Sequence, residues 1–276
     1  EALSSIISQT YKNWELIFWD NKSTDKSRQI FNSFKSKKFR YFKSKKHVSL
    51  YKAKNFAIKK CKGDFVSFID ADDVWEKDKL KNQLKLFSNK NIGVVYGNMW
   101  IRNENFNKSK VYWKKKLPEG FIYNDLINNY CVGIISTIIK KKILNLRKNI
   151  FNENYNHIGD FDLFIKLSKK HKFGVIQNPV ATYRIHGSNL SFVNRENEIK
   201  ELKHWLKKNK KQLKNLEKKI IEQKIEQKNF INTKLEGSFY RSLKFFLASK
   251  SLKYKIKNLI FLFLPTNLLK KIMWYV

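Results

Sequence analysis

One segment, Asp64 to Trp75, constrains the fold more than any other, and it reads Asp-Phe-Val-Ser-Phe-Ile-Asp-Ala-Asp-Asp-Val-Trp. Its apolar run, Phe65 to Ile69, consists of β-forming residues and predicts a short strand buried on both faces. Three carboxylates, Asp70, Asp72 and Asp73, follow within four residues. A buried strand that ends in clustered negative charge predicts a binding or catalytic site at its carboxyl end.

The spacing of these acids suggests a cation site. Asp70 and Asp72 are two residues apart, so in an extended chain their side chains project to the same side. Two converging carboxylates repel each other unless a cation lies between them. Oxygen ligands of this kind suit Mg2+ or Mn2+. A second interpretation is a polar turn in which Asp73 caps a helix over Lys79 to Phe87.

A second apolar run also ends in an acid, because Leu16 to Trp19 is followed by Asp20, Asn21 and a polar turn. Around these two runs helices are predicted over residues 1–9, 25–34 and 50–61, and strands over 16–19, 39–42 and 65–69. The alternation predicts an α/β fold whose doubly wound, mostly parallel sheet is flanked by helices. Ligands bind at the carboxyl ends of strands in such sheets, where Asp20 and Asp70 are expected to lie.

Beyond the acids the sequence pattern predicts a second half of the fold. It indicates a helix over 79–87, a strand over 93–96, a hairpin over 99–113 and helices over 124–129, 138–146 and 160–169. Asp160 would stand at the start of the last helix, where the helix dipole favours the charged form of a carboxylate.

Several motifs, in order, resemble the family 2 glycosyltransferases of the GT-A fold over residues 1 to 191. They are Ser8-Gln9-Thr10, Trp14-Glu15-Leu16, Asp20-Asn21-Lys22-Ser23-Thr24-Asp25, Ala53-Lys54-Asn55, Lys62-Gly63-Asp64, Asp70-Ala71-Asp72-Asp73 and Tyr183-Arg184-Ile185-His186-Gly187-Ser188-Asn189-Leu190-Ser191. The resemblance implies transfer of a sugar from a nucleotide diphosphate sugar, a uridine nucleotide in many members, to an acceptor hydroxyl, with inversion at the anomeric carbon.

The resemblance also implies roles in donor binding. Asp72 matches the metal-binding acid of the family, and Asp70 is the first acid of the same motif, closer to the ribose. Asp20 and Asn21 match the pair that reads base and ribose, although some members have Asp where this chain has Asn21. Lys54 stands where many members have Arg and would contact phosphate or base; the alternative is a solvated lysine.

Two further assignments concern the reaction itself. Ile158-Gly159-Asp160-Phe161-Asp162 resembles the family motif whose first Asp is the general base, which assigns that role to Asp160 and a supporting role to Asp162. His186 would complete the metal shell or bond the diphosphate, and Arg184 would donate hydrogen bonds to phosphate oxygens. Without the motif, a lone histidine such as His186 is more often structural.

The resemblance predicts a nucleotide-sugar-binding half over 1–98 and an acceptor-binding half over 99–191. Beyond it, the sequence pattern predicts a basic amphipathic helical region over 192–276. In that last region, one stripe of a long helix is predicted from Ile199, Leu202, Leu206, Leu213, Leu216 and Ile220. Past Glu236 there is no acidic residue, and basic residues including Lys270 and Lys271 alternate with apolar ones. This pattern is typical of a segment lying on an anionic membrane surface. The alternative is a helical pair that packs on its own domain or on a partner chain.

Composition bounds the remaining possibilities. The formal net charge of +35 raises the question of nucleic-acid binding, but nearly all 58 basic residues are lysine and no finger or ribonucleoprotein signature accompanies them, so we expect no nucleic-acid partner. The two cysteines, Cys61 and Cys131, are far apart in sequence, which predicts neither a disulfide framework nor a zinc site and fits a reducing cytosol.

The leading hypothesis is an inverting, metal-dependent glycosyltransferase of surface polysaccharide synthesis, peripheral at the inner face of the plasma membrane, whose acceptor is a glycan or a lipid-linked saccharide. A rival is a protein of the same fold that binds nucleotide sugars without turnover. The chain opens at Glu1, without the apolar strand that normally begins family members, so we expect its true N-terminus to be missing. Donor specificity is expected to depend on Tyr96 to Met99 and on Gly133 to Thr137.

Overall fold

The computed structural model describes residues 1–144, 146, 148–187, 189, 194–249 and 251–269, without side-chain detail at 252 and 253. Five residues of the sequence motifs and of the basic tail therefore lie outside the described residues: Ser188, Leu190, Ser191, Lys270 and Lys271. The chain divides into two compact units, Glu1–Asn189 and Leu190–Val276.

The first half of the N-terminal unit alternates helix and strand as the sequence predicts. Its elements are α1 (Ala2–Ile7), β1 (Leu16–Asp20), α2 (Ser27–Ser33), β2 (Phe39–Lys43), α3 (Leu50–Lys60) and β3 (Phe65–Ser67). Strands β1 and β2 pair in parallel. Phe31 of α2 lies 4.8 Å from Phe18 of β1, ring centre to ring centre, and Phe56 of α3 lies 5.2 Å from Trp19. Aromatic contacts thus fix one helix on each side of the strand that ends in Asp20.

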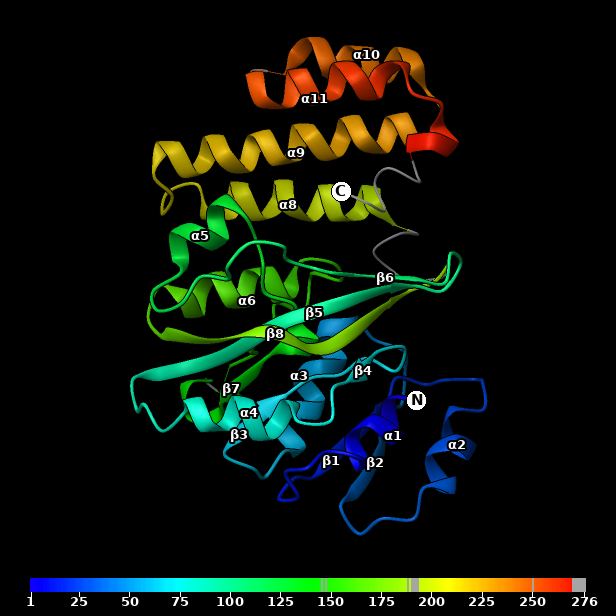
Figure 1. The fold of residues 1–276 in the computed structure, drawn as a ribbon, viewed down its shortest axis with the longest axis vertical. Helices are drawn as coiled ribbons and strands as arrows, with labels where there is room; N and C mark the ends of the chain where they lie inside the picture. The colour runs from blue at the N-terminus through cyan, green and yellow to red at the C-terminus, as the bar shows by residue number, and fades with distance from the viewer. Residues whose placement is uncertain (145, 147, 188, 190–193, 250, 270–276) are drawn as a thin grey trace. The chain divides into compact units, whose positions relative to one another are not determined.

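The second half of this unit builds a larger sheet. Its elements are β4 (Val74–Trp75), α4 (Lys79–Leu86), β5 (Ile92–Asn103), β6 (Lys108–Val111), α5 (Tyr123–Asn128), η1 (Ile134–Ser136), β7 (Ile138–Lys140), η2 (Lys141–Ile143), α6 (Gly159–Ser168) and β8 (Lys172–Ile185). The strand order is β3-β7-β5-β8-β4, with β6 on β5. Figure 1 shows the long strands β5 and β8 side by side through this sheet. The core lies on them, since Val94, Val95, Tyr96 and Phe173 have no exposed surface.

The α/β fold class is confirmed, and the sheet is more mixed than the sequence predicts. Pairs β1–β2 and β5–β8 are parallel. Pairs β3–β7, β4–β8, β5–β6 and β5–β7 are antiparallel. The β5–β6 pair is a hairpin through residues 104–107, and such a short connection favours the antiparallel direction, whereas β7 and β4 pair with strands far from them in the sequence.

The helix predicted over 138–146 is wrong. Ile138 and Ile139 form β7, which pairs with β3 on one side and β5 on the other, and a single 3-10 turn follows. Both side chains are buried, at 1% and 0% exposure. A short run of β-branched residues enclosed by two strands satisfies strand geometry, and periodicity alone does not separate it from a buried helix.

Two expectations around the acidic segment also need correction. Strand β3 is not buried on both faces, because Phe65 is 37% exposed while Val66 is buried. Asp73 does not cap the helix α4, whose N-cap residue is Asp78. Asp73 instead accepts a hydrogen bond of 3.1 Å from the backbone N–H of Arg184.

In the described part of the C-terminal unit, the named helices are α8 (Arg195–Asn209), α9 (Asn215–Leu235), α10 (Phe239–Ala248) and α11 (Leu252–Phe263), and residues 266–269 are also helical. The single long helix predicted from the apolar stripe is two helices, because Glu217 accepts the backbone N–H of Lys214 and begins a new helix there. Of the predicted stripe, Ile199 and Leu202 are buried, but Leu216 is 69% exposed. None of the helices in the described part of the chain is long and apolar enough to span a membrane.

Candidate active site

Helix α3 positions two of the acids predicted to be functional. Its residues Tyr51 and Lys54 are three apart and therefore lie on one face. The ammonium of Lys54 contacts a carboxylate oxygen of Asp70 at 2.5 Å, and the hydroxyl of Tyr51 donates to a carboxylate oxygen of Asp160 at 3.1 Å. One helix face thus links the acid after β3 to the acid that begins α6.

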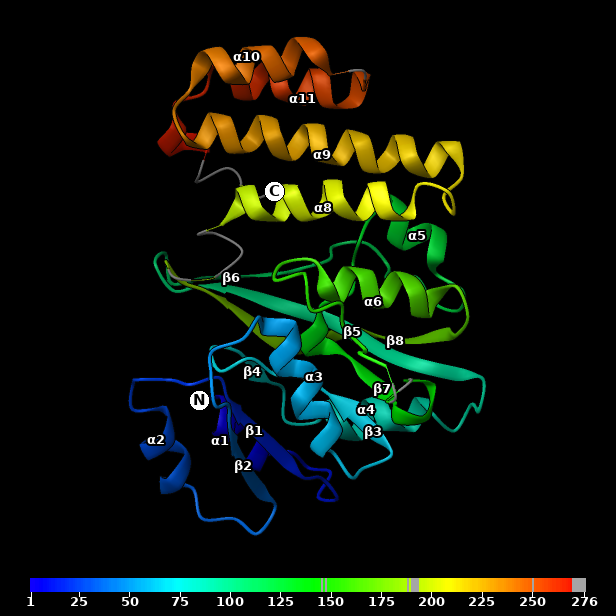
Figure 2. The same ribbon diagram turned by 180° about the vertical axis from the view of Figure 1, so that it is seen from behind.

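The position of α3 is set by hydrogen bonds to the loop before α6. The Asn55 side chain donates to the carbonyl of Phe151 and accepts the N–H of the same residue, both at 2.9 Å. The hydroxyl of Ser49, just before α3, donates to the carbonyl of Glu153 at 2.9 Å. Figures 1 and 2 show α3 and α6 on the same side of β5 and β8. These bonds from side chains to backbone attach α3 to the loop that leads into α6.

The acids after β3 lie in a turn rather than an extended chain. The N–H of Asp73 donates to the carbonyl of Asp70 at 3.1 Å, which closes the turn. The carboxylates of Asp70 and Asp72 consequently contact different groups, Lys54 and His186. The extended geometry on which the shared side of Asp70 and Asp72 is conditional does not persist, because β3 ends at Ser67 and a turn follows.

Asp72 lies beside the His-Gly motif of the downstream segment. Its carboxylate is 3.0 Å from Nε2 of His186 and accepts a hydrogen bond of 3.3 Å from Asn189. Both side chains of the Asp72–His186 pair are about one-third exposed. The guanidinium of Arg184 donates to the backbone carbonyl of Asp72 and pairs with Glu1 at 2.9 Å. Residues more than a hundred positions apart are thus brought together here, as the motifs predict.

Asp72 and His186 are chemically suited to a divalent ion. A carboxylate oxygen and an imidazole nitrogen at 3.0 Å, open to solvent, fit an ion that takes its remaining ligands from water and phosphate oxygens. Among the described residues, no cluster of three or more His, Cys, Asp or Glu side chains is arranged to hold a metal by itself. The metal role of Asp70, Asp72 and His186 stays a prediction.

Asp73 is the buried member of the acidic group. It has no exposed surface, and one of its carboxylate oxygens has no hydrogen-bond partner. Burial raises the pKa of Asp73 to about 8, and the charges of Asp70 and Asp72 act in the same direction. The other oxygen of Asp73 accepts the backbone N–H of Arg184 on β8, so this side chain links the acidic turn to that strand.

Asp160 is enclosed by two phenols. Its oxygens accept hydrogen bonds from Tyr51 at 3.1 Å, Tyr130 at 3.3 Å and the N–H of Phe161 at 2.8 Å. Burial raises the pKa of Asp160, and these three donors oppose the rise. A carboxylate with a raised pKa at a helix N-terminus has the properties of a general base. Asp162, which is 3% exposed, pairs with Lys166 at 2.5 Å.

Asp20 and Asn21 organise the end of β1. The Asp20 carboxylate is buried and accepts hydrogen bonds from the Tyr41 hydroxyl and the Ser23 N–H. Burial acts to raise the pKa of Asp20, but these hydrogen bonds outweigh it and lower the pKa. Asn21 bonds both the carbonyl and the N–H of Val48, at 2.8 and 3.1 Å. Ser23 and Tyr41, which bond Asp20, lie near β1 and β2, so the convergence of Asp20 with Asp70 stays a prediction.

Sequence reasoning missed the three tyrosines that contact these acids. Tyr51, Tyr130 and Tyr41 bond the carboxylates of Asp160 and Asp20. The spacing of Tyr51 from Lys54 on one helix face was a signal for the first. Tyr130 lies in a loop and Tyr41 on a neighbouring strand, and no local pattern links either to its acid.

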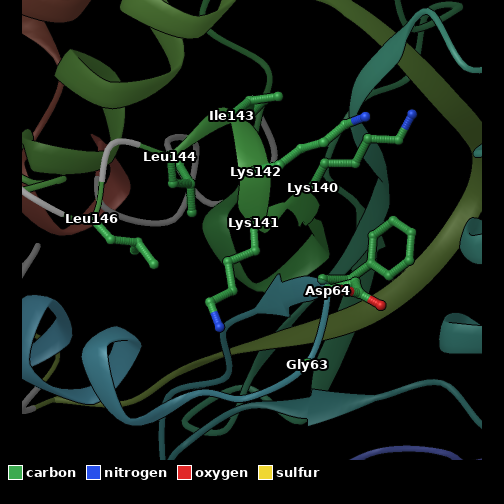
Figure 3. Close-up of a pocket in the computed structure, with 9 residues that line it drawn as sticks. Gly63, Asp64, Lys140, Lys141, Lys142, Ile143, Leu144 and Leu146 are labelled. Atoms are coloured by element: carbon green, nitrogen blue, oxygen red, sulfur yellow. The ribbon is translucent and has the colours of Figure 1, made fainter.

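A cavity of about 880 Å³ lies at the opposite end of β3 from the acids. Figure 3 shows its wall, to which Lys140, Lys141 and Lys142 contribute from β7 and η2 and Asp64 from the start of β3. Lys141 is engaged, because its ammonium donates to the carbonyl of Cys61 at 2.6 Å. Because this cavity is remote from Asp70 along the strand, we assign it no part in the chemistry.

The fold and the acid-ended strands define a class of enzyme, the glycosyltransferases of the GT-A fold. TarS of S. aureus, solved in complex with UDP-GlcNAc, superposes with a TM-score of 0.62 at 19% identity, over 93% of this chain and 74% of that one. The mannosyltransferase PcManGT of Pyrobaculum calidifontis, solved with GDP-Man and Mn2+, gives 0.58 at 14% identity, over 91% and 72%. At these identities the likeness concerns the fold.

The sequence comparisons identify the family. The profile of Glycosyl transferase family 2 matches residues 1–151, and the chain belongs to this family. The UDP-Glc:alpha-D-GlcNAc-diphosphoundecaprenol beta-1,3-glucosyltransferase WfaP of Escherichia coli is 30% identical over 204 residues, which are 73% of this chain and 76% of that protein. WfgD, of the same description and organism, is 29% identical over the same shares. The resemblance stated from the motifs is confirmed, and the chain is a glycosyltransferase.

Proposed function

We propose that this chain transfers a sugar, with inversion, from a UDP-linked donor to a hydroxyl of a lipid-linked saccharide in surface polysaccharide synthesis. The observation that carries the proposal is the pair of acid centres on one face of α3, where Lys54 contacts Asp70 and Tyr51 contacts Asp160. The relatives WfgD and WfaP, described as acting on a diphosphoundecaprenol-linked sugar, support the choice of acceptor. Their UDP-Glc donor, and the UDP-GlcNAc bound by TarS, support the choice of base.

In this proposal residues 1–98 bind the donor and 99–191 the acceptor. Asp20 and Asn21 contact ribose and base, Asp70 contacts the ribose side of the donor, and Arg184 donates to diphosphate oxygens. Asn21 would have to release Val48, or share its amide with it, to read a base. Lys54 balances the charge of Asp70 and would contact the phosphates of the bound donor.

Asp72 and His186 would hold a divalent cation, Mn2+ or Mg2+, together with the diphosphate. When bound, such an ion supplies positive charge that stabilises the leaving diphosphate. Asn189 holds the carboxylate of Asp72, and Arg184 holds its backbone carbonyl.

Asp160 acts as the general base. It accepts the proton of the acceptor hydroxyl as the oxygen attacks the anomeric carbon and the bond to the diphosphate breaks. One base and one direct displacement produce inversion. The raised pKa of Asp160 brings its basicity closer to neutral pH, which favours proton transfer there.

The enzyme would work as a peripheral protein at the cytoplasmic face of the membrane that holds the acceptor. The basic helices after Glu236 and the absence of acids among them support this location.

The test is sugar transfer from a panel of UDP- and GDP-sugars to a synthetic lipid diphosphate GlcNAc, with Mn2+ or with chelator. Asp160→Asn should lower kcat roughly 10²–10⁴-fold while donor binding persists. Asp72→Asn should abolish metal-dependent donor binding. Asp64→Asn, at the other end of β3, is the matched control and should retain activity.

Unchanged turnover in Asp160→Asn would overturn the base assignment. Binding of every nucleotide sugar without any transfer by the wild type would favour the rival, a binding protein of this fold.

A further inference from the structure

The C-terminal unit turns a set of large apolar side chains outward. They are Phe239 (49% exposed), Tyr240 (81%) and Leu247 (66%) on α10, and Ile256 (62%), Leu259 (50%), Ile260 (61%) and Phe263 (72%) on α11. We call these seven residues the α10–α11 face. Exposed apolar surface of this density is unusual on a soluble protein and marks a site of interaction.

The geometry of α11 concentrates its share of the face in one stripe. Positions 256, 259, 260 and 263 follow the spacing i, i+3, i+4, i+7, which places them on one side of a helix. The opposite side is already used, because Phe261 and Leu262 are buried in a cluster with Phe230 of α9. The exposed stripe is therefore not needed for packing α11 within its own unit.

Hydrogen bonds fix which sides of the two helices are turned outward. The ammonium of Lys234 in α9 donates to the carbonyl of Leu262 at 2.7 Å, and Ser242 of α10 donates to Thr233 of α9 at 3.2 Å. Figures 1 and 2 show α10 and α11 together on the side of α9 away from α8. The rings of Phe239 and Phe263 lie 6.4 Å apart, centre to centre, so the two helices contribute to one continuous surface.

The two helices that carry the face have basic side chains and no acidic ones, and Arg241 pairs at 3.8 Å with Glu236, just after α9. No acidic residue occurs after Glu236, while Arg241 and Lys244 lie on α10 and Lys255 and Lys257 flank Ile256 on α11. An amphipathic surface of apolar side chains bordered by lysines matches a bilayer interface, where the apolar groups enter the acyl boundary and the cations meet anionic headgroups.

We propose that the α10–α11 face docks on an anionic lipid bilayer. A second copy of this chain is a poorer occupant, because a symmetric contact would place the same basic residues against each other without acids to pair them. The biological reason for docking, delivery of the donor site to a lipid-linked acceptor, rests on the proposed function. The observations that support docking, the exposed apolar side chains and the lysines around them, do not depend on it.

The test is co-sedimentation of the full chain with vesicles of phosphatidylcholine alone or with added phosphatidylglycerol. The double variant Ile256→Glu/Ile260→Glu should weaken binding to the mixed vesicles at least about tenfold, because it removes apolar burial and adds repulsion. Leu216→Glu is the matched control, since Leu216 is 69% exposed on α9 outside the face, and it should bind like the wild type. Lys244→Gln/Lys257→Gln should reduce the preference for anionic vesicles by roughly fivefold per charge.

Nucleotide-sugar binding is measured on the same variants and should not change, which separates failure of this inference from failure of the proposed function. Vesicle binding that is equal in the double variant and the wild type would overturn the inference. A wild-type dimer in sedimentation equilibrium that is dissociated in the double variant would also overturn it, because the face would then bind a second copy. A double variant that melts at a lower temperature but still binds vesicles would overturn it as well, because the face would then serve packing.

Discussion

The base assigned to this enzyme is tuned by two hydroxyls, so its chemistry can be probed without removing it. Tyr51 and Tyr130 each donate to Asp160, at 3.1 and 3.3 Å. Both hydrogen bonds favour the charged carboxylate and oppose the rise in pKa that burial causes. The pair therefore controls the pH at which the base becomes available.

Tyr130→Phe is expected to shift the pH dependence of transfer. Losing the hydroxyl removes a donor to the carboxylate, so the pKa of Asp160 rises further and the acid limb of kcat moves to higher pH. A long, charge-assisted bond supports a shift of about one pH unit or less. The measurement is kcat against pH on both proteins, with kcat nearly unchanged well above the limb.

Tyr41→Phe is the control for that shift. Tyr41 donates to Asp20, which is assigned to the donor, so its loss should change KM for the nucleotide sugar and leave the acid limb in place. An acid limb that stays fixed in Tyr130→Phe would show that the phenol only supports packing against Phe161.

At the scale of elements, the contact between α3 and α6 depends on a glycine. A Cβ on Gly159, the first residue of α6, would lie 2.4 Å from the Tyr51 ring, which is closer than carbon atoms approach. Tyr51 is 4% exposed and has little room to move. The glycine therefore allows Tyr51 of α3 to reach Asp160 at the start of α6.

Gly159→Ala is accordingly expected to destabilise the unit by about 1–3 kcal/mol and to lower transfer, since overpacking displaces Tyr51 from Asp160. Thermal unfolding and kcat measured together check this. Gly63→Ala is the control, because its Cβ would meet only the carbonyl oxygen of Phe65 at 3.6 Å. A Gly159→Ala protein with wild-type melting temperature and kcat would contradict the argument.

Elements bounded by turns and acids could be predicted from the sequence, whereas those defined by tertiary pairing could not. The strand ending in Asp20 and the helix carrying Lys54 follow from apolar spacing and lie where expected. Strand β8 was missed, because Pro179 and the polar pair before it argue against a strand. The structure accommodates them with a bulge, in which Gln177 bonds the backbone of Leu117 in place of the ladder.

The candidate site shows the same division. Its acids occur in sequence motifs that can be recognised without the structure. The motifs also link Asp72 with His186, and the two side chains are 3.0 Å apart. The tyrosines around Asp160 come from α3 and from a loop before η1, and only the folded chain brings them to one carboxylate.

At the scale of the molecule, the net charge of +35 would attract the chain to any anionic surface. That attraction is screened by salt, whereas contact between apolar side chains and lipid is not. Charge alone therefore does not distinguish adsorption of the whole molecule from docking through the α10–α11 face, but the response to salt does.

At about 1 M salt, where the Debye length is ~3 Å, the wild type is expected to keep part of its binding to anionic vesicles. The Ile256→Glu/Ile260→Glu variant should lose nearly all of its remaining binding, because only the screened electrostatic attraction is left to it. Leu216→Glu should follow the wild type. Co-sedimentation across a salt series measures both curves. Wild-type binding that falls to the level of the double variant would mean that charge, and not the apolar stripe of α11, holds the protein on these vesicles.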